Sequence, residues 1–155
     1  MRPGAPTDEN RQGHEDVKSI SPVLTVRDVD ASIAFYKEVL GFPDGDVLRM
    51  PNGTPVHGMV RWGSVAIDLS PEAMSPPVGD NRGDGVTLYV YVDADVDGYF
   101  QKVVGNGAEV VEDLKTQHWG DRTFTIADPD GYKLMFAQTV RQVSIEDMQK
   151  AMSQA

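Results

Sequence analysis

The tripeptide Asp-Val-Asp occurs twice in this chain, at 28–30 and at 95–97, and each copy lies where a predicted strand ends and a predicted helix begins. Apolar residues at helical spacing follow each copy, and each predicted helix ends at a glycine, Gly41 or Gly107. Three predicted strands follow each helix. The sequence therefore predicts an α+β fold made of two tandem βαβββ modules, in which each sheet must bury one face.

The pattern divides the chain into five segments. A flexible tail is predicted at 1–17, where Pro, Gly and charged residues leave little to bury. The first module is predicted at 18–70, a linker rich in Pro, Gly and Asp at 71–85, the second module at 86–139 and a C-terminal helix at 140–155. The predicted elements are a helix at 28–42 with strands at 19–28, 47–50, 56–63 and 64–70, then a helix at 93–107 with strands at 86–92, 108–114, 122–128 and 132–138.

The composition limits the classes of partner. Asp and Glu number 24 and Lys and Arg number 14, for a net charge of −10. Binding to nucleic acid or to an anionic membrane requires a basic face, so neither partner is expected. The absence of cysteine excludes disulfides and thiolate chemistry. No apolar run is long enough for a membrane span and the start has no apolar signal core, so a cytoplasmic protein is expected.

Two segments, VRDVDASIAFYKEVLGF at 26–42 and QHWGDRTFTIADPDGYKLMF at 117–136, resemble the vicinal oxygen chelate superfamily when taken with the tandem module order. That superfamily includes glyoxalase I, extradiol dioxygenases and bleomycin-resistance proteins. The resemblance implies that the curved mixed sheets form a cup around a central cavity and that the chain is a homodimer. The linker at 71–85 is long enough for modules to pair within one chain or between two chains, so both arrangements stay open.

The metalloenzymes of that superfamily hold a divalent metal with His and Glu side chains from four strands. The resemblance places those four positions at Ser21, Asp68, Thr87 and Met135. Hydroxyl groups bind divalent ions poorly, methionine sulfur suits copper(I), and one aspartate cannot replace a cage of three or four ligands. A metal-free member of the bleomycin-resistance-like branch, with no cofactor, is therefore predicted. His57 and His118 lie in different modules and are expected to cap a strand or to be exposed.

Strand alternation assigns side chains to two faces. A mixture of polar and apolar side chains lies on the same face as the four metal positions and would line the cavity: Ser21, Val23, Thr25, Ser64, Ala66, Asp68, Thr87, Tyr89, Tyr91, Lys133, Met135 and Ala137. The other face is almost purely apolar and is expected to pack beneath the helices: Leu24, Val26, Val65, Ile67, Leu69, Leu88, Val90, Val92, Leu134 and Phe136. A mixed wall is typical of a small-molecule pocket, but also of an open sheet that faces solvent. The predicted ligand contacts are Trp62, Asp68, Thr87, Tyr89, Tyr91, Trp119 and Met135.

These patterns predict a small-molecule-binding protein that sequesters an antibiotic or toxic compound. The alternative is a lyase, isomerase or dioxygenase of the same superfamily, either metal-dependent or using Asp68 as general base with Tyr89 or Tyr91 as hydrogen-bond donor. Trp119 is either a lid over the ligand or a structural plug. The apolar stripe of the C-terminal helix either docks on its own domain or forms a dimer contact. The DPDG segment at 128–131 is predicted to be a turn with no chemical role.

Overall fold

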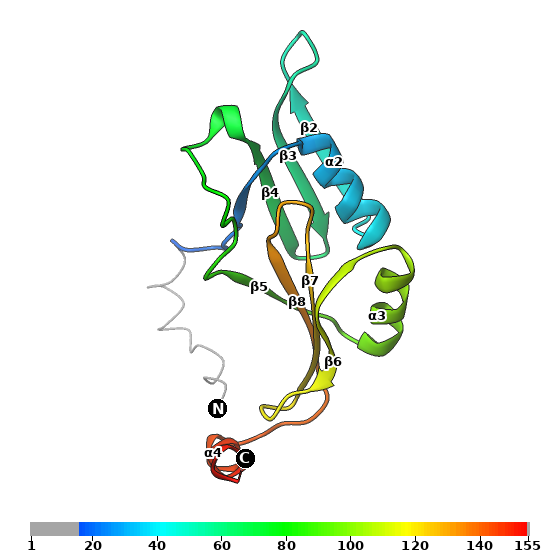
Figure 1. Ribbon diagram of the computed structural model, residues 1–155, viewed down its shortest axis with the longest axis vertical. Coiled ribbons are helices and arrows are strands. Elements are labelled where there is room, and N and C mark those ends of the chain that lie inside the picture. Colours follow the sequence, from blue (N-terminus) through cyan, green and yellow to red (C-terminus); the bar gives the residue numbers. More distant parts are fainter. Residues whose placement is uncertain (1–15, 155) are drawn as a thin grey trace.

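A computed structural model of the chain, drawn in Figure 1, describes residues 16–154. Residues 1–15 of the predicted tail lie outside the described residues, as does Ala155. The described elements are β1 (Val23–Val26), α2 (Val29–Ala34), the π-helical turn η1 (Phe35–Val39), β2 (Asp44–Arg49), β3 (Pro55–Trp62), β4 (Val65–Pro71), the 3₁₀ turn η2 (Glu72–Met74), β5 (Thr87–Tyr91), α3 (Val96–Gly105), β6 (Glu109–Thr116), β7 (Asp121–Ala127), β8 (Lys133–Thr139) and α4 (Ile145–Ser153).

The strands form two four-stranded sheets with the orders β1-β4-β3-β2 and β5-β8-β7-β6. In each sheet the first strand pairs in parallel with the last strand of its module, and the other pairs are antiparallel. The register repeats as well, because Val23 lies beside Asp68 in the first sheet and Tyr89 lies beside Met135 in the second. The predicted α+β class and tandem βαβββ modules are confirmed.

Aspartates begin both helices of the modules. Asp28 caps α2 and accepts a hydrogen bond of 3.0 Å from the Ala31 N–H, while Asp95 caps α3 and accepts one of 3.0 Å from the Gly98 N–H. Such caps satisfy N–H groups that have no partner within the helix. The first helix continues beyond Ala34 as the π-helical turn, whereas the sequence pattern predicts one regular helix.

The sequence of the polar segment PDGD at 43–46 favours a turn, but its residues 44–46 belong to strand β2. Gly45 lies opposite Val60 of β3, and a Cβ atom at Gly45 would lie 3.1 Å from Ile33 and 3.0 Å from Lys37. The glycine therefore allows the helix to pack closely on the strand. Pairing with β3 outweighs the local turn preference of Pro, Asp and Gly.

The core lies between the sheets and the helices. The predicted alternation is confirmed there, because Leu24, Val26, Ile67, Leu69, Leu134 and Phe136 are all at most 6% exposed. Phe124 stacks on Phe136 with ring centroids 5.3 Å apart, and Tyr99 of α3 contacts both rings. One apolar cluster includes buried residues of both modules. No helix within residues 16–154 is long and apolar enough to cross a membrane.

The turn before β8 joins the second module to the first. Asp130 accepts hydrogen bonds from the Arg27 N–H at 2.9 Å and from the Ser32 hydroxyl at 3.4 Å. Its carboxylate also lies 3.5 Å from the Arg82 guanidinium, whose side chain is only 4% exposed. Arg82 donates to the Thr25 carbonyl at 3.0 Å, so the predicted linker contributes a buried cation to the junction.

Asp128 lies beside Asp130 in the same junction. It accepts hydrogen bonds from the N–H groups of Asp130 and Tyr132, each at 2.9 Å, which forms the predicted turn. It also accepts one of 2.9 Å from the hydroxyl of Tyr36, a fully buried side chain of the first module. The predicted turn at DPDG is confirmed, and its two carboxylates also connect the modules.

Candidate functional site

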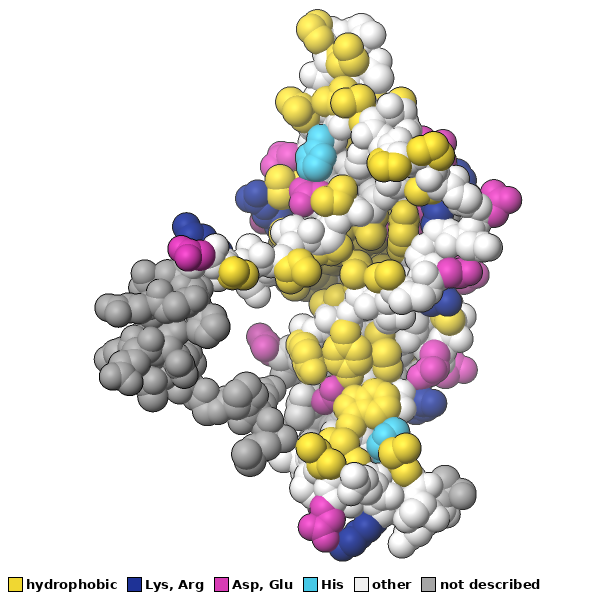
Figure 2. All heavy atoms as spheres, turned by 90° about the vertical axis from the view of Figure 1, so that its left-hand side faces the viewer, with side chains coloured by type: hydrophobic (Ala, Val, Ile, Leu, Met, Phe, Trp, Pro, Cys, Tyr) yellow, Lys and Arg dark blue, Asp and Glu magenta, His cyan; other side chains and the backbone are white. Residues whose placement is uncertain are grey.

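The sheet faces that carry no helix are open to solvent. Helices α2 and α3 lie on one side of the two sheets in Figure 1, and Figure 2 shows apolar side chains gathered on the opposite side. On these helix-free faces Val23 is 61% exposed, Leu48 64% and Tyr91 62%. Within one chain, the two open sheets therefore leave apolar side chains uncovered.

A chain of hydrogen bonds organises the helix-free face of the second sheet. The Trp119 indole N–H donates to the Tyr89 hydroxyl at 3.0 Å, and Tyr89 donates to the Asp121 carboxylate at 2.6 Å. Burial raises the pKa of Tyr89, and its hydrogen bond to Asp121 raises that pKa further. Tyr89 therefore remains a neutral phenol that fixes the orientation of both neighbours.

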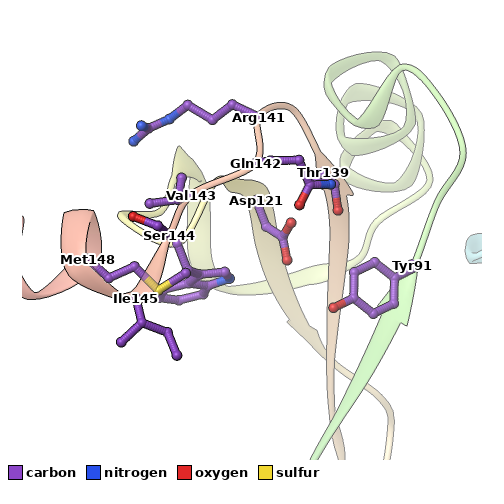
Figure 3. A pocket seen from close by; sticks show the side chains of 10 residues that line it. Tyr91, Asp121, Thr139, Arg141, Gln142, Val143, Ser144, Ile145 and Met148 are labelled. Atoms are coloured by element: carbon purple, nitrogen blue, oxygen red, sulfur yellow. The ribbon is translucent and has the colours of Figure 1, made fainter. Parts of the chain in front are cut away.

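A hollow of about 750 Å³ lies between this face and α4. Asp121, Thr139 and Tyr91 line its sheet side, and α4 contributes Met148 to the opposite side (Figure 3). The full lining is Tyr91, Trp119, Asp121, Thr139, Arg141, Gln142, Val143, Ser144, Ile145 and Met148.

Gly120 holds the segment before α4 against the second sheet. Its carbonyl accepts hydrogen bonds from the N–H groups of Val140 at 2.9 Å and Arg141 at 3.2 Å. Its φ of +98° is favourable for glycine, and a Cβ atom here would lie 2.2 Å from the Arg141 carbonyl oxygen. The absence of a side chain thus permits the contact that brings α4 to the hollow.

The residues at the four metal positions do not fit a divalent-metal cage. Only Asp68 offers a charged oxygen, while Ser21 and Thr87 offer hydroxyls and Met135 a soft thioether. Within the described part of the chain, no group of three or more His, Asp or Glu side chains lies close enough together to hold a metal ion.

The first module carries a polar pair that the sequence pattern does not reveal. His57 of β3 contacts Asp68 of β4, with Nε2 and Oδ1 3.0 Å apart, and its side chain is 39% exposed. Strand pairing brings them together, because Met59 lies opposite Asp68 and His57 is two residues from Met59 on the same face. The carboxylate of Asp68 therefore holds the His57 imidazole in place on the helix-free face of the first sheet.

The structure brings some of the predicted ligand contacts together and separates others. Tyr91 and Trp119 line the hollow, and the Tyr89 hydroxyl accepts a hydrogen bond from the Trp119 indole N–H. Thr87 and Met135 share the sheet face but do not line the hollow. Asp68 lies on the other sheet.

Trp62 lies apart from the hollow near α4. It packs edge-on against Phe42 at 5.5 Å and Tyr99 at 5.9 Å, and it lines a second hollow of about 620 Å³ between the modules. These contacts explain Trp62 as a packing residue, and its contact with a ligand stays a prediction.

Asp121 and the segment before α4 are functional candidates that the sequence pattern does not single out. Strand alternation could have placed Asp121 on the helix-free face, because it is in phase with Thr123 and Thr125 on one face of β7. No local signal places α4 against the sheet, since that contact depends on Gly120 and on the path of residues 140–143.

The comparisons with known proteins agree with this architecture. The family model described as Glyoxalase/Bleomycin resistance protein/Dioxygenase superfamily matches residues 19–136. An uncharacterised protein of Mycobacterium bovis is 32% identical over 141 residues, which are 87% of this chain and 92% of that protein.

Two solved structures share the fold. A glyoxalase-related enzyme from Clostridium phytofermentans aligns with a TM-score of 0.63 and 24% identity, over 80% of this chain and 96% of that one. TioX from a Micromonospora species aligns with a TM-score of 0.62 and 24% identity, over 79% of this chain and 99% of that one. With its tandem βαβββ modules and the family-model match across both of them, the chain belongs to the Glyoxalase/Bleomycin resistance protein/Dioxygenase superfamily.

Proposed function

We propose that this chain is a metal-free small-molecule-binding protein that sequesters a toxic or antibiotic compound in the hollow beside α4. The supporting observation is the hollow itself, whose volume of about 750 Å³ lies within the range of ligand sites. Trp119, Tyr91 and apolar side chains of the α4 segment supply contact area, and Asp121 supplies an oriented polar group. The donor set at the four family metal positions supports the metal-free part of the proposal.

Nuclear magnetic resonance of the indole N–H groups tests this proposal, because the chain has only two tryptophans. Addition of aromatic compounds is expected to shift the Trp119 signal in a saturable way, since Trp119 lines the hollow. The Trp62 signal is the internal control, because Trp62 lies outside this hollow. Trp119→Phe is expected to weaken binding about tenfold. The proposal fails if neutral, cationic and anionic aromatic compounds all leave the Trp119 signal unchanged at millimolar concentration.

We also propose that the chain is a homodimer in which a second copy covers the helix-free face of the first sheet. Val23 and Leu48 expose apolar surface on this face, and burial of such surface drives association. A second copy presents the same face of its first sheet and so offers matching apolar surface, as expected of a symmetric interface.

Charged substitutions test the dimer. Val23→Glu and Leu48→Glu are expected to convert a dimer into a monomer, because each would bury an unpaired carboxylate. Val104→Glu is the matched control, since Val104 is 41% exposed on α3 and lies on the helix side. The molar mass measured by light scattering after size-exclusion chromatography distinguishes the outcomes. A monomeric wild type, or a Val23→Glu variant that stays dimeric, contradicts this interface.

A further inference from the structure

Asp121 presents to the hollow a carboxylate that has no positive partner among the described residues. The residue is 5% exposed, and its Oδ2 atom accepts one hydrogen bond from Tyr89. Among the hydrogen bonds and ion pairs within residues 16–154, none involves Oδ1, and no Lys, Arg or His nitrogen lies within 4.0 Å of the carboxylate. A carboxylate oxygen that no protein donor occupies is free to accept a charge-assisted hydrogen bond from a cationic ligand.

The aromatic side chains beside Asp121 also favour a cation. Tyr91 and Trp119 line the same hollow, and the rings of Tyr89 and Tyr91 lie 5.1 Å apart. The faces of such rings carry negative potential and attract positively charged groups. The hydrogen bonds through Tyr89 hold Trp119 and the carboxylate in place before a ligand arrives.

The features that would favour an anion are weaker. Over the described chain, Arg141 is the one basic residue in the lining, and Figure 3 shows its side chain extending away from Asp121. The N-terminus of α4 also faces the hollow, but its first turn carries Glu146 and Asp147. The Ser144 hydroxyl already accepts the Asp147 N–H at 3.1 Å.

We infer that the ligand of this hollow is an aromatic cation, whose positive centre lies against Asp121 while its ring packs on Trp119 and Tyr91. This inference rests on the proposed small-molecule function and names the class of compound. The net charge of −10 on the chain favours the approach of such a cation.

Three probes of similar shape separate charge from hydrophobic contact. They are 1-methylquinolinium, its neutral isostere 1-methylnaphthalene, and the anion 1-naphthoate. The dissociation constant of each follows from the concentration dependence of the Trp119 indole N–H shift, with Trp62 as the internal control. The cation is expected to bind at least about tenfold more tightly than the neutral probe, and the anion more weakly than either.

Asp121→Asn removes the charge and keeps an acceptor for the Tyr89 hydroxyl. It is expected to weaken binding of the cation at least about tenfold and to leave the neutral probe unchanged within about twofold. Asp113→Asn is the control, because it removes the same charge from an exposed position of β6. Equal binding of the three probes, or tighter binding of 1-naphthoate, overturns the inference while the proposed function stands. No binding of any probe contradicts both, and loss of cation binding in Asp113→Asn contradicts the local role of Asp121.

Discussion

Replacement of Asp128 by alanine is expected to lower the free energy of unfolding by about 4 kcal/mol, because three donors lose their acceptor and each buried unpaired group costs about 1–3 kcal/mol. The donors are the N–H groups of Asp130 and Tyr132 and the hydroxyl of Tyr36, which is fully buried. The substitution also disturbs the turn that presents Asp130 to the first module. Urea denaturation followed by tryptophan fluorescence measures the loss.

Two control variants distinguish the stability that the junction between modules contributes from the ordinary cost of removing an aspartate. Asp28→Ala removes an exposed helix cap with one hydrogen bond and is expected to cost about 1 kcal/mol. Tyr36→Phe removes only the connection between modules and is expected to cost about 1–2 kcal/mol. If Asp128→Ala costs no more than Asp28→Ala, Asp128 contributes only a local turn.

The pH dependence of Asp128→Asn gives a second test of the same residue. Burial raises the pKa of Asp128 above 3.8, and hydrogen bonds from Tyr132, Tyr36 and Asp130 oppose that rise without cancelling it. The folded state therefore binds this proton more tightly than the unfolded state. The stability from this group is fully present below the unfolded pKa and is lost as the pH rises through the raised pKa. The wild type should thus gain stability relative to Asp128→Asn as the pH is lowered through that interval.

The parts of the fold that are predictable from sequence are those set by local pattern. The repeated Asp-Val-Asp tripeptide marks both helix starts, and strand alternation identifies buried side chains such as Leu69 and Phe136. The junction between modules has no such pattern, because Arg27 and Asp130 are separated by 103 positions. At 43–46 the local pattern predicts the wrong structure, because its preference for a turn is outweighed by pairing with a neighbouring strand.

The candidate site divides in the same way. Trp119 and Tyr91 could be selected from aromatic type and strand phase, and both line the hollow. Their polar neighbours are set by contacts that are distant in the sequence, because Tyr89 donates its hydrogen bond to Asp121, 32 positions away. The opposite side of the hollow comes from α4, whose position depends on a backbone contact. Side-chain type is readable in the sequence, whereas the distances that turn side chains into a site are not.

Substitution of Gly120 by alanine tests that backbone contact and is expected to lower the free energy of unfolding by about 3 kcal/mol. A residue with a Cβ atom at positive φ costs about 1–2 kcal/mol, and the added Cβ atom would also lie 2.2 Å from the Arg141 carbonyl oxygen. The segment at 140–143 must then move, which withdraws α4 from the hollow. Binding of aromatic probes at Trp119 is therefore expected to weaken as well.

Gly107→Ala is the matched control, because Gly107 has a φ of +96°, close to the +98° of Gly120, but an added Cβ atom there would have no atom of the described residues within 4 Å. It should incur only the cost of positive φ, about 1–2 kcal/mol, and should retain probe binding. Chemical denaturation and the Trp119 indole signal report the two effects separately. Equal losses of stability in both variants would show that the backbone contact at Gly120 contributes nothing. Unchanged probe binding in Gly120→Ala would show instead that the ligand does not need α4. The difference in stability between the two variants measures the packing of the 140–143 segment, because both variants lose the same conformational preference of glycine.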